Sequence, residues 1–318
     1  MASKVPSITV LGSLNMDVVS YVSHMPAAGE TMASNSFAVS PGGKGANQAI
    51  ACAKLSRSAS SPATNESAHI RMLGAVGADA YGNQLTSNLT AHGVDCTGVT
   101  VSPDLQTGVS VIIVEEPTGQ NRIIFSAQAN NSLRASQFTT LPDPKPDLLI
   151  MQLETPLPVV LAAMKAALNA SVPVLLNPAP AQPLPDEAYT GLAHLVVNET
   201  EAAILSGLSE ADLDTEPGLE KAGSIFIERG VQNVIITLGG RGVYYVSART
   251  NKKGLVPAEK AKVVDTTAAG DTFVGRYALD VVGGAFDIEA AVRAANRASA
   301  KTVEKLGAQD SIPWRDEL

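Results

Sequence analysis

Apolar runs of strand length alternate with helical patterns along most of this chain, and no other feature constrains its fold as strongly. Such alternation predicts βαβ units, which assemble into a mostly parallel sheet with helices on both faces. The expected fold class is therefore α/β, with three α/β/α layers. Helices are expected at residues 44–55, 157–169, 199–206 and 271–282. Strands are expected at residues 8–14, 70–76, 148–153, 172–176, 195–197 and 233–238.

Shorter β-rich segments interrupt this alternation. They lie at residues 18–21, 30–39, 107–115 and 121–126. Their half-apolar composition is typical of a small sheet with one open face. Because the sequence contains no internal repeat and no long linker, we expect one domain over residues 1–318. A β-sheet lid, formed by about 16–40 and 105–126, is inserted in its α/β core.

Composition and charge exclude several classes of protein. The chain is 45% apolar and carries a net charge of −8, with its lysines and arginines scattered, whereas a nucleic-acid-binding protein is normally basic or carries a basic stripe. Cys52 and Cys96 are too few and too far apart for a disulfide framework or a zinc site. No apolar run reaches membrane-spanning length, and residues 1–7 have no signal-peptide pattern. We therefore expect a cytoplasmic protein.

Segment 264–273 is the strongest candidate for chemistry, because ligands of open α/β sheets bind beyond the carboxyl ends of the strands. A loop with the small residues Ala268, Ala269 and Gly270 opens into a helix at about Asp271. The first turn of a helix presents unpaired N–H groups, and small side chains let anionic oxygens approach them closely. Asp271 is a candidate catalytic carboxylate. The alternative is that it caps the helix N-terminus.

Two segments contain residues suited to hydroxyl groups. In residues 40–48, glycines precede a helix, but Lys44 is followed by glycine, so this is not a P-loop. The G-x-G-x-x-G dinucleotide fingerprint is missing as well. Lys44 and Asn47 could bond ligand hydroxyls. Asn15 and Asp17 lie two residues apart on one face of an extended chain, which suits either adjacent sugar hydroxyls or a local turn.

Two further strand ends could contact a nucleotide or its metal ion. Asn198 and Glu201 match a capping box at a helix N-terminus, and the same side chains could hold Mg²⁺ through water. In residues 237–243, glycines at a strand end permit either a tight turn or a nucleotide lying against the backbone.

Together these motifs resemble the branch of the PfkB carbohydrate kinase family that phosphorylates ribose. The resemblance runs from Gly12 to Trp314, and its two signature regions are residues 41–48 and 265–273. The chain departs from the family pattern in a Ser-rich insertion at 56–67, expected as a surface loop, and at Thr267. Further landmarks are Met151-Gln152-Leu153-Glu154, Leu176-Asn177-Pro178-Ala179-Pro180, Asn198-Glu199-Thr200-Glu201 and Gly307-Ala308-Gln309.

The resemblance implies a role for individual residues. Asp271 matches the catalytic base. The anion hole is matched by Ala268, Ala269 and Gly270. Ribose-binding positions are matched by Asn15, Asp17, Gly43, Lys44, Asn47, Glu154 and Asp271. Nucleotide-side positions are matched by Asn198, Thr237, Gly239, Gly242 and Asn296. The implied monovalent cation, K⁺, is matched by Asp265, Thr267, Gly307 and Ser311.

The implied reaction is in-line transfer of the γ-phosphoryl group of ATP to the 5-hydroxyl of D-ribose, which yields ribose 5-phosphate and ADP. An open-faced lid sheet often pairs with a second copy, so a homodimer through the lid is expected. The alternatives are a related kinase acting on deoxyribose, fructose or a nucleoside, and a catalytically inactive sugar sensor. The pair of Asn15 and Asp17, together with Glu154, favours a free pentose. The missing fingerprint disfavours a dinucleotide-dependent oxidoreductase.

Overall fold

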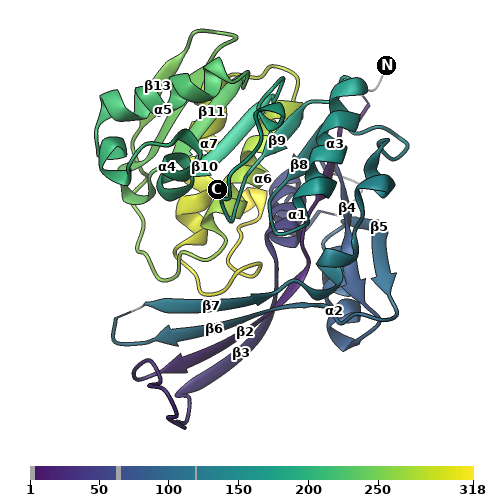
Figure 1. Ribbon diagram of the computed structural model, residues 1–318, viewed down its shortest axis with the longest axis vertical. Helices are drawn as coiled ribbons and strands as arrows, with labels where there is room; N and C mark the ends of the chain where they lie inside the picture. Colours follow the sequence, from purple (N-terminus) through teal and green to yellow (C-terminus); the bar gives the residue numbers. More distant parts are fainter. Residues whose placement is uncertain (1–3, 62–65, 119) are drawn as a thin grey trace.

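A nine-stranded sheet forms the centre of the protein, in the order β13-β12-β11-β10-β9-β8-β1-β4-β5 (Figure 1). The computed structural model describes residues 4–61, 66–118 and 120–318, so part of the insertion at 56–67 lies outside the described residues. Neighbouring strands are parallel except in the two pairs that involve β12. The strands are β1 (Ser7–Leu11), β4 (His69–Gly77), β5 (Asp95–Ser102), β8 (Leu148–Met151), β9 (Val174–Leu176), β10 (His194–Asn198), β11 (Asn233–Thr237), β12 (Val243–Ser247) and β13 (Lys253–Val256).

Helices cover both faces of this sheet. One face carries α1 (Lys44–Ser56), α2 (Ala80–Ala91), α6 (Ala269–Val282) and α7 (Ile288–Thr302). The other carries α3 (Leu157–Asn169), α4 (Glu199–Ser206) and α5 (Glu216–Glu228). Successive strand residues alternate between the two cores: Ile150 packs with the first group of helices and Leu149 with the second. Because both faces are buried, such strands are apolar at nearly every position, and the predicted three-layer α/β/α fold is confirmed.

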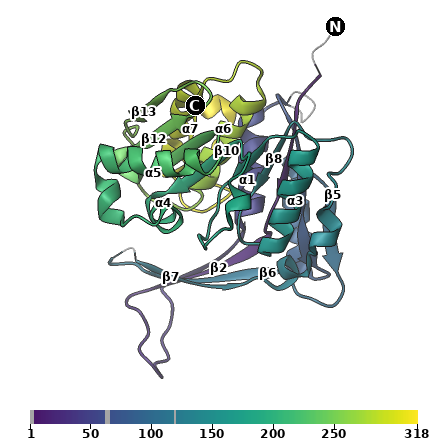
Figure 2. The same cartoon turned by 45° about the horizontal axis from the view of Figure 1, so that its top comes forward.

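A separate four-stranded sheet, in the order β3-β2-β6-β7, lies across one end of the α/β body (Figures 1 and 2). Its strands are β2 (Asn15–Val22), β3 (Ser36–Gly42), β6 (Gly108–Glu115) and β7 (Asn121–Ser126). β2 follows β1 after only three residues, so the chain passes directly from the carboxyl end of β1 in the central sheet into the small sheet. The expected small sheet is therefore present, and β2 connects it to the core.

Several expected strands are shorter in the structure. Those at 8–14 and 172–176 form β1 and β9 only over Ser7–Leu11 and Val174–Leu176, and the strand expected at 30–39 differs most. Residues 30–35, expected as part of a strand, are not extended sheet, and β3 begins at Ser36. The pairing of β2 with β3 ends at Tyr21 and Ser36, so the preceding residues have no partner strand. Glu30 closes a turn instead, since its carboxylate accepts a hydrogen bond from the N–H of Ala27 at 2.9 Å. A strand needs a partner, and an extended pattern alone does not supply one.

Helix α1 lies unusually close to its neighbours on two sides. A Cβ atom on Gly45 would lie 2.6 Å from the backbone of Gly12, which follows β1. On the other side, a Cβ on Gly275 of α6 would lie 2.4 Å from the Cβ of Ala51. These glycines are therefore required by close backbone approach, and they bring α1 and α6 together.

Two expectations from composition can be compared with the structure. Cys52 is buried and Cys96 partly buried, and both are free thiols. Among the described residues, no helix is both long and apolar enough to cross a bilayer.

A buried histidine links α6 to the amino end of β10. The Nδ1 atom of His194 lies 2.9 Å from the hydroxyl of Tyr277, and the rings of Tyr277 and Phe286 pack edge-on against the imidazole. Burial lowers the pKa of His194 from its ordinary value of 6.5 to about 3. The side chain is therefore neutral in the folded protein, while the unfolded chain protonates it below pH 6.5.

We predict that this histidine makes the protein less stable in acid. Because the unfolded state binds the extra proton, its contribution is complete above pH 6.5 and falls by about 1.4 kcal/mol for each pH unit below that, toward pH 3. Urea unfolding at pH 7 and pH 5.5 measures the loss. A His194→Gln variant retains a polar partner for Tyr277 and should lose less stability over this interval. An equal loss in both proteins would contradict the assignment.

Candidate functional site

Four carboxylates surround one lysine where the two sheets meet. Burial alone would lower the pKa of Lys44, but the negative charges of Asp271, Glu154, Glu201 and Asp17 outweigh this effect and raise that pKa. The five residues come from α1, α6, the segment after β8, α4 and β2. Residues predicted from separate motifs are therefore neighbours in space, at the carboxyl edge of the central sheet, as expected for an α/β protein.

The carboxylate of Asp271 faces α1. Helix α6 begins at Ala269, two residues earlier than expected, and its N-cap is Ala268. Asp271 Oδ2 accepts a hydrogen bond from Asn47 Nδ2 at 3.0 Å, and its Oδ1 accepts one from Gln48 Nε2 at 2.9 Å. The alternative that Asp271 caps its own helix is therefore wrong. Its carboxylate is instead held in place by amides of a second helix.

The turn before Asp271 presents backbone to open space. Ala268 has a φ of 59°, in the left-handed region that residues with side chains rarely adopt. Ser299 donates its hydroxyl to the carbonyl of Ala269 at 2.8 Å and so supports the turn from α7. A Cβ on Gly270 would meet nothing within 4 Å. The first N–H groups of α6 lack helical acceptors, although that of Ala269 makes a long hydrogen bond to the carbonyl of Thr266 at 3.3 Å, so this turn has the space to receive an anion.

Glu154 organises the segment between β1 and β2. Its Oε2 accepts hydrogen bonds from the Ser13 hydroxyl, from the N–H of Lys44 at 3.0 Å and, more weakly, from Asn15 Nδ2 at 3.5 Å. Asn130 holds Asn15 from the other side by donating to its Oδ1 at 2.8 Å. Asn15 and Glu154 are therefore neighbours, and Ser13 and Asn130 orient them. Neither Ser13 nor Asn130 was predicted from the sequence.

Asp17 lies two residues farther along β2 and is buried. Burial raises the pKa of Asp17 to about 6, a hydrogen bond from Ser110 offsets part of this shift, and the negative charges of Glu154 and Asp271 add to it. A Cβ on Gly42 of the paired strand would lie 2.0 Å from the Asp17 carboxylate, so a larger residue there would displace that carboxylate. A carboxylate with so little hydration favours a ligand that donates hydroxyl groups to it.

Gly43 has a role in the backbone before any ligand is considered. It is the N-cap of α1 with a φ of 88°, and a Cβ there would lie 2.7 Å from the backbone nitrogen of Asn15. The glycine is therefore required for the start of α1 to reach β2. This packing also explains why glycines are dense in the segment before Lys44.

The predicted capping box at Asn198 is present. The N–H of Glu201 donates to Asn198 Oδ1 at 2.8 Å, and the N–H of Asn198 donates to Glu201 Oε2 at 2.9 Å. Thr237 of β11 pairs with Asn198 in the sheet. The box uses one carboxylate oxygen of Glu201 and leaves Oε1, and a water-bound Mg²⁺ needs no more than this from the protein.

The other predicted nucleotide-side residues lie around the turn between β11 and β12. Gly239 has a φ of 52°, and a Cβ there would enter open space. A Cβ on Gly242 would lie 2.0 Å from the carbonyl oxygen of Val256, so packing already requires this glycine. Asn296 of α7 donates its Nδ2 to the carbonyl of Pro257 at 2.7 Å. Of the three, Gly239 is the position with room for a ligand against its backbone.

Asp265 joins the two halves of the predicted cation loop. Its Oδ1 accepts hydrogen bonds from the N–H and hydroxyl of Thr267 at 2.9 and 2.7 Å, and its Oδ2 accepts one from the N–H of Gly307 at 2.9 Å. Ser311 is buried and donates its hydroxyl to the carbonyl of Ala308 at 2.7 Å. Because the Asp265 carboxylate is already occupied by donors, this loop offers mainly carbonyl oxygens.

Such a donor set suits a monovalent cation better than a chelated transition metal. Among the described residues, no group of three or more His, Cys, Asp or Glu side chains could hold a metal ion. Mg²⁺ and K⁺ bind oxygen ligands and water, so the free oxygen of Glu201 and the carbonyl oxygens of this loop are compatible with them.

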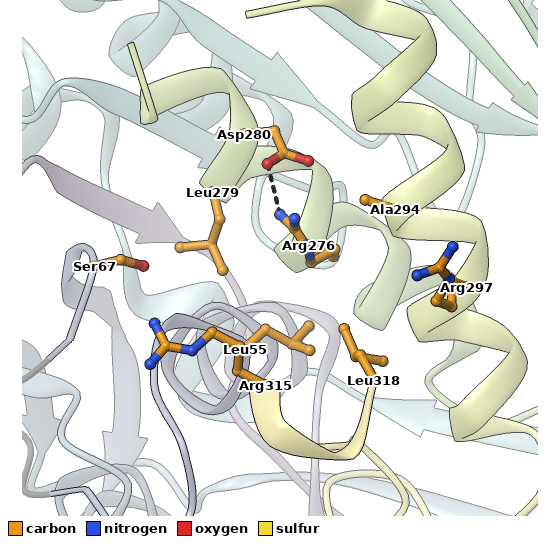
Figure 3. A pocket seen from close by; sticks show the side chains of 9 residues that line it. All are labelled: Leu55, Ser67, Arg276, Leu279, Asp280, Ala294, Arg297, Arg315 and Leu318. Atoms are coloured by element: carbon orange, nitrogen blue, oxygen red, sulfur yellow. Dashed lines mark ion pairs between the residues drawn. The ribbon is translucent and has the colours of Figure 1, made fainter. Parts of the chain in front are cut away.

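A pocket of about 490 Å³ lies elsewhere, between α1, α6 and α7 (Figure 3). Arg276 in this pocket is paired with Asp280 at 2.9 Å. Figure 3 shows Arg297 and Arg315 at opposite ends of it. Its positive charges do not converge on one position, so we do not assign it as the site of chemistry.

Three glutamines beside the cluster around Lys44 have no role in the sequence-based predictions. Gln48, Gln152 and Gln309 are all buried. Gln48 follows Asn47 in the signature segment, and Gln152 directly follows β8, so the strand-end rule could have selected it. Gln309 belongs to the landmark Gly307-Ala308-Gln309, but that pattern indicated no role for its side chain.

Three comparisons relate the chain to known proteins. The family model for pfkB family carbohydrate kinases matches residues 5–315. A ribokinase of Schizosaccharomyces pombe is 42% identical over 313 residues, which cover 96% of this chain and 95% of the relative. The structure of ribokinase from Thermotoga maritima has a TM-score of 0.81 at 36% identity. The matched region covers 98% of this chain and 97% of the Thermotoga chain. Arabidopsis thaliana ribokinase, complexed with ribose and ATP, has a TM-score of 0.85 at 29% identity with the same coverage.

We predict that Asp17→Asn stabilises the protein without ligand. Because the pKa of Asp17 rises from 3.8 to about 6 on folding, its ionisation costs about 3 kcal/mol of stability at pH 7. The amide carries no charge and can still accept the Ser110 hydroxyl. Urea unfolding should show the gain in full above pH 6 and its disappearance below pH 4, where the aspartic acid is neutral in both states. A variant less stable than wild type at pH 7 would contradict this assignment.

Proposed function

Because the chain belongs to the pfkB family of carbohydrate kinases, we propose that it transfers the γ-phosphoryl group of ATP to the 5-hydroxyl of D-ribose. The observation that carries the proposal is the Asp271 carboxylate, held by Asn47 and Gln48 beside an open helix N-terminus. A base next to an anion site is the arrangement that phosphoryl transfer to a hydroxyl group requires.

In the proposed reaction Asp271 acts as the general base. It accepts the proton of the 5-hydroxyl as that oxygen attacks the γ-phosphorus, and the bond from phosphorus to the departing ADP breaks. The backbone amides of Ala268, Ala269 and Gly270 stabilise the charge on the transferred group. The small sheet serves as a lid that limits the access of water, which would otherwise accept the phosphoryl group.

The ribose hydroxyls are assigned to the polar cluster between the two sheets. Asn15, Asp17 and Glu154 accept hydrogen bonds from hydroxyl groups, and Lys44 and Asn47 donate hydrogen bonds to hydroxyl oxygens. Gly43 contributes backbone at the edge of the same cluster. Two observations support a sugar here: the desolvated Asp17 carboxylate, whose pKa is raised to about 6, and the similarity to a ribokinase whose structure holds ribose and ATP.

ATP is assigned to the region beyond β10 and β11. The residues proposed to contact it are Asn198, Thr237, Gly239, Gly242 and Asn296. Glu201 would hold Mg²⁺ through water, and the loop with Asp265, Thr267, Gly307 and Ser311 would hold K⁺. Mg²⁺ bound there would neutralise charge on the phosphate oxygens. A cytoplasmic location stays a prediction.

We assign the outer face of the lid sheet to a second copy of the chain. Val39, Val111 and Ile124 lie level with Val18 in the sheet register, so they share the face opposite to Asp17. Ile124 is 63% exposed and the two valines about 40%. A contiguous exposed apolar face of this kind is typical of an interaction surface.

A charge in the middle of this face should therefore give a monomer. We expect wild-type protein to elute as a dimer in size-exclusion chromatography with light scattering, and Val111→Asp to shift it to the monomer mass. Leu255→Asp is the matched control, because Leu255 is a strand residue of similar exposure in the central sheet. A monomeric wild-type protein at working concentration would overturn the dimer.

Steady-state kinetics with a coupled ADP assay tests the proposed activity. We expect the highest kcat/KM with ribose in a panel that includes deoxyribose, fructose and adenosine. Asp271→Asn should reduce kcat on the order of 10²–10⁴-fold, because the proton then has no base to receive it. Activity with adenosine and none with ribose would replace the proposed substrate. An Asp271→Asn variant with wild-type turnover would overturn the role of Asp271 as the base, whereas wild-type protein without turnover of any sugar in the panel would leave the inactive sugar sensor as the better description.

A further inference from the structure

Buried carboxamides form two chains that end on the two oxygens of the Asp271 carboxylate. On one side, Gln152 Nε2 donates to Gln48 Oε1 at 2.6 Å, and Gln48 Nε2 donates to Asp271 Oδ1 at 2.9 Å. On the other, Gln309 Nε2 donates to Asn47 Oδ1 at 3.0 Å, and Asn47 Nδ2 donates to Asp271 Oδ2 at 3.0 Å. Each carboxylate oxygen therefore has its own chain.

An ionised carboxylate determines the direction of both chains. It only accepts hydrogen bonds, so each adjacent amide must turn its NH₂ group toward Asp271 and its carbonyl away. The next amide must then present its own NH₂ group to that carbonyl. All four amides follow this order, and Asn88 of α2 extends one chain by donating to Gln309 Oε1 at 2.6 Å.

Gln48 is also anchored to the central sheet. Its second N–H donates to Asn177 Oδ1 at 3.0 Å, and Asn177 Nδ2 donates to the carbonyl of Val196 at 2.9 Å. Asn177 follows β9 and Val196 lies in β10. The hydrogen bond from Gln48 to Asp271 therefore connects the carboxylate to rigid strands.

Gln152 shows that this orientation is imposed from the carboxylate. Its Oε1 is buried and has no hydrogen-bond partner within the part of the chain that the structure describes. Folded proteins rarely leave a buried acceptor unpaired. If the amide were turned over, its oxygen would face the Gln48 carbonyl oxygen, and the series of hydrogen bonds to Asp271 would be interrupted. The unpaired oxygen is thus the consequence of keeping every NH₂ group directed toward Asp271.

We propose that Gln48 and Gln309 are positioning residues for the phosphoryl transfer, Gln48 by its bond to Asp271 and Gln309 through Asn47. The inference rests on the proposed function. Each amide occupies one acceptor direction of a carboxylate oxygen and leaves another for the substrate hydroxyl. The chains thereby hold the base at one angle to the attacking oxygen, and small misplacements of such groups reduce rates strongly.

The test is a double-mutant cycle with methionine, which matches the length of glutamine but cannot donate. Gln48→Met should lower kcat with ribose on the order of 10–10²-fold and leave the KM for ATP unchanged. In an Asp271→Asn background the same substitution should cause no further loss of kcat, because the positioned base is already gone. Gln309→Met should show the same pattern with a smaller effect, since Gln309 is one hydrogen bond farther from Asp271 than Gln48 is.

Asn233→Leu is the matched control for the loss of a buried amide. Asn233 lies at the start of β11, where its Nδ2 donates to the carbonyl of Ala193 at 2.9 Å. It should lower the urea midpoint and leave kcat unchanged. Urea midpoints of all variants are measured alongside the kinetics, and Gln309→Met keeps the test valid if Gln48→Met does not fold.

The possible outcomes separate the inference from the activity itself. An equal loss of kcat from Gln48→Met in the wild-type and Asp271→Asn backgrounds would overturn the positioning role, as would a loss of the same size in Asn233→Leu. Wild-type protein without ribose kinase activity would instead overturn the proposed function. A loss confined to the background with an intact Asp271 supports the inference.

Discussion

The close packing of α1 between β1 and α6 is the constraint on which the rest of the site depends. Gly45 approaches Gly12 on one side, and Gly275 approaches Ala51 on the other, at distances that exclude a Cβ atom. Only at this separation can amides at the start of α1 reach the carboxylate of Asp271 on the neighbouring helix. A side chain at either contact would move the helices apart and leave that carboxylate without its donors.

This packing places an unusual density of charge inside the protein. Lys44 and four carboxylates share the junction of the two sheets, and burial raises the pKa of Asp17 to about 6. Ala268 adopts a left-handed conformation, and Gln152 leaves a buried oxygen unpaired within the described residues. The ionised Asp17, the left-handed Ala268 and the unpaired Gln152 oxygen each oppose stability, and each adjoins Asp271 or its neighbours. Such costs concentrate at functional sites, where the arrangement of polar groups matters more than the local free energy.

The regular core could be predicted because its strands are buried on both faces. Continuous apolar runs identified β8, β10 and β11 within one or two residues. Strand β5 was not identified, because it lies at the edge of the sheet and mixes polar with apolar residues. Residues 30–35 were wrongly expected as strand, since pairing decides whether an extended segment becomes sheet. Predicted strand boundaries were wrong where hydrogen bonds to a neighbouring strand decide how far the strand extends.

The sequence by itself determined the α/β fold, the glycine-rich helix start before Lys44 and the loop that ends at Asp271, because these are local patterns of size, charge and periodicity. Only the tertiary structure decided which groups donate hydrogen bonds to the Asp271 carboxylate. Its partners Asn47 and Gln48 lie 224 and 223 residues away, and Gln309 lies 262 residues from Asn47. Hydrogen bonds over such separations arise from the packing of helices on a common sheet, so no local pattern can specify their direction.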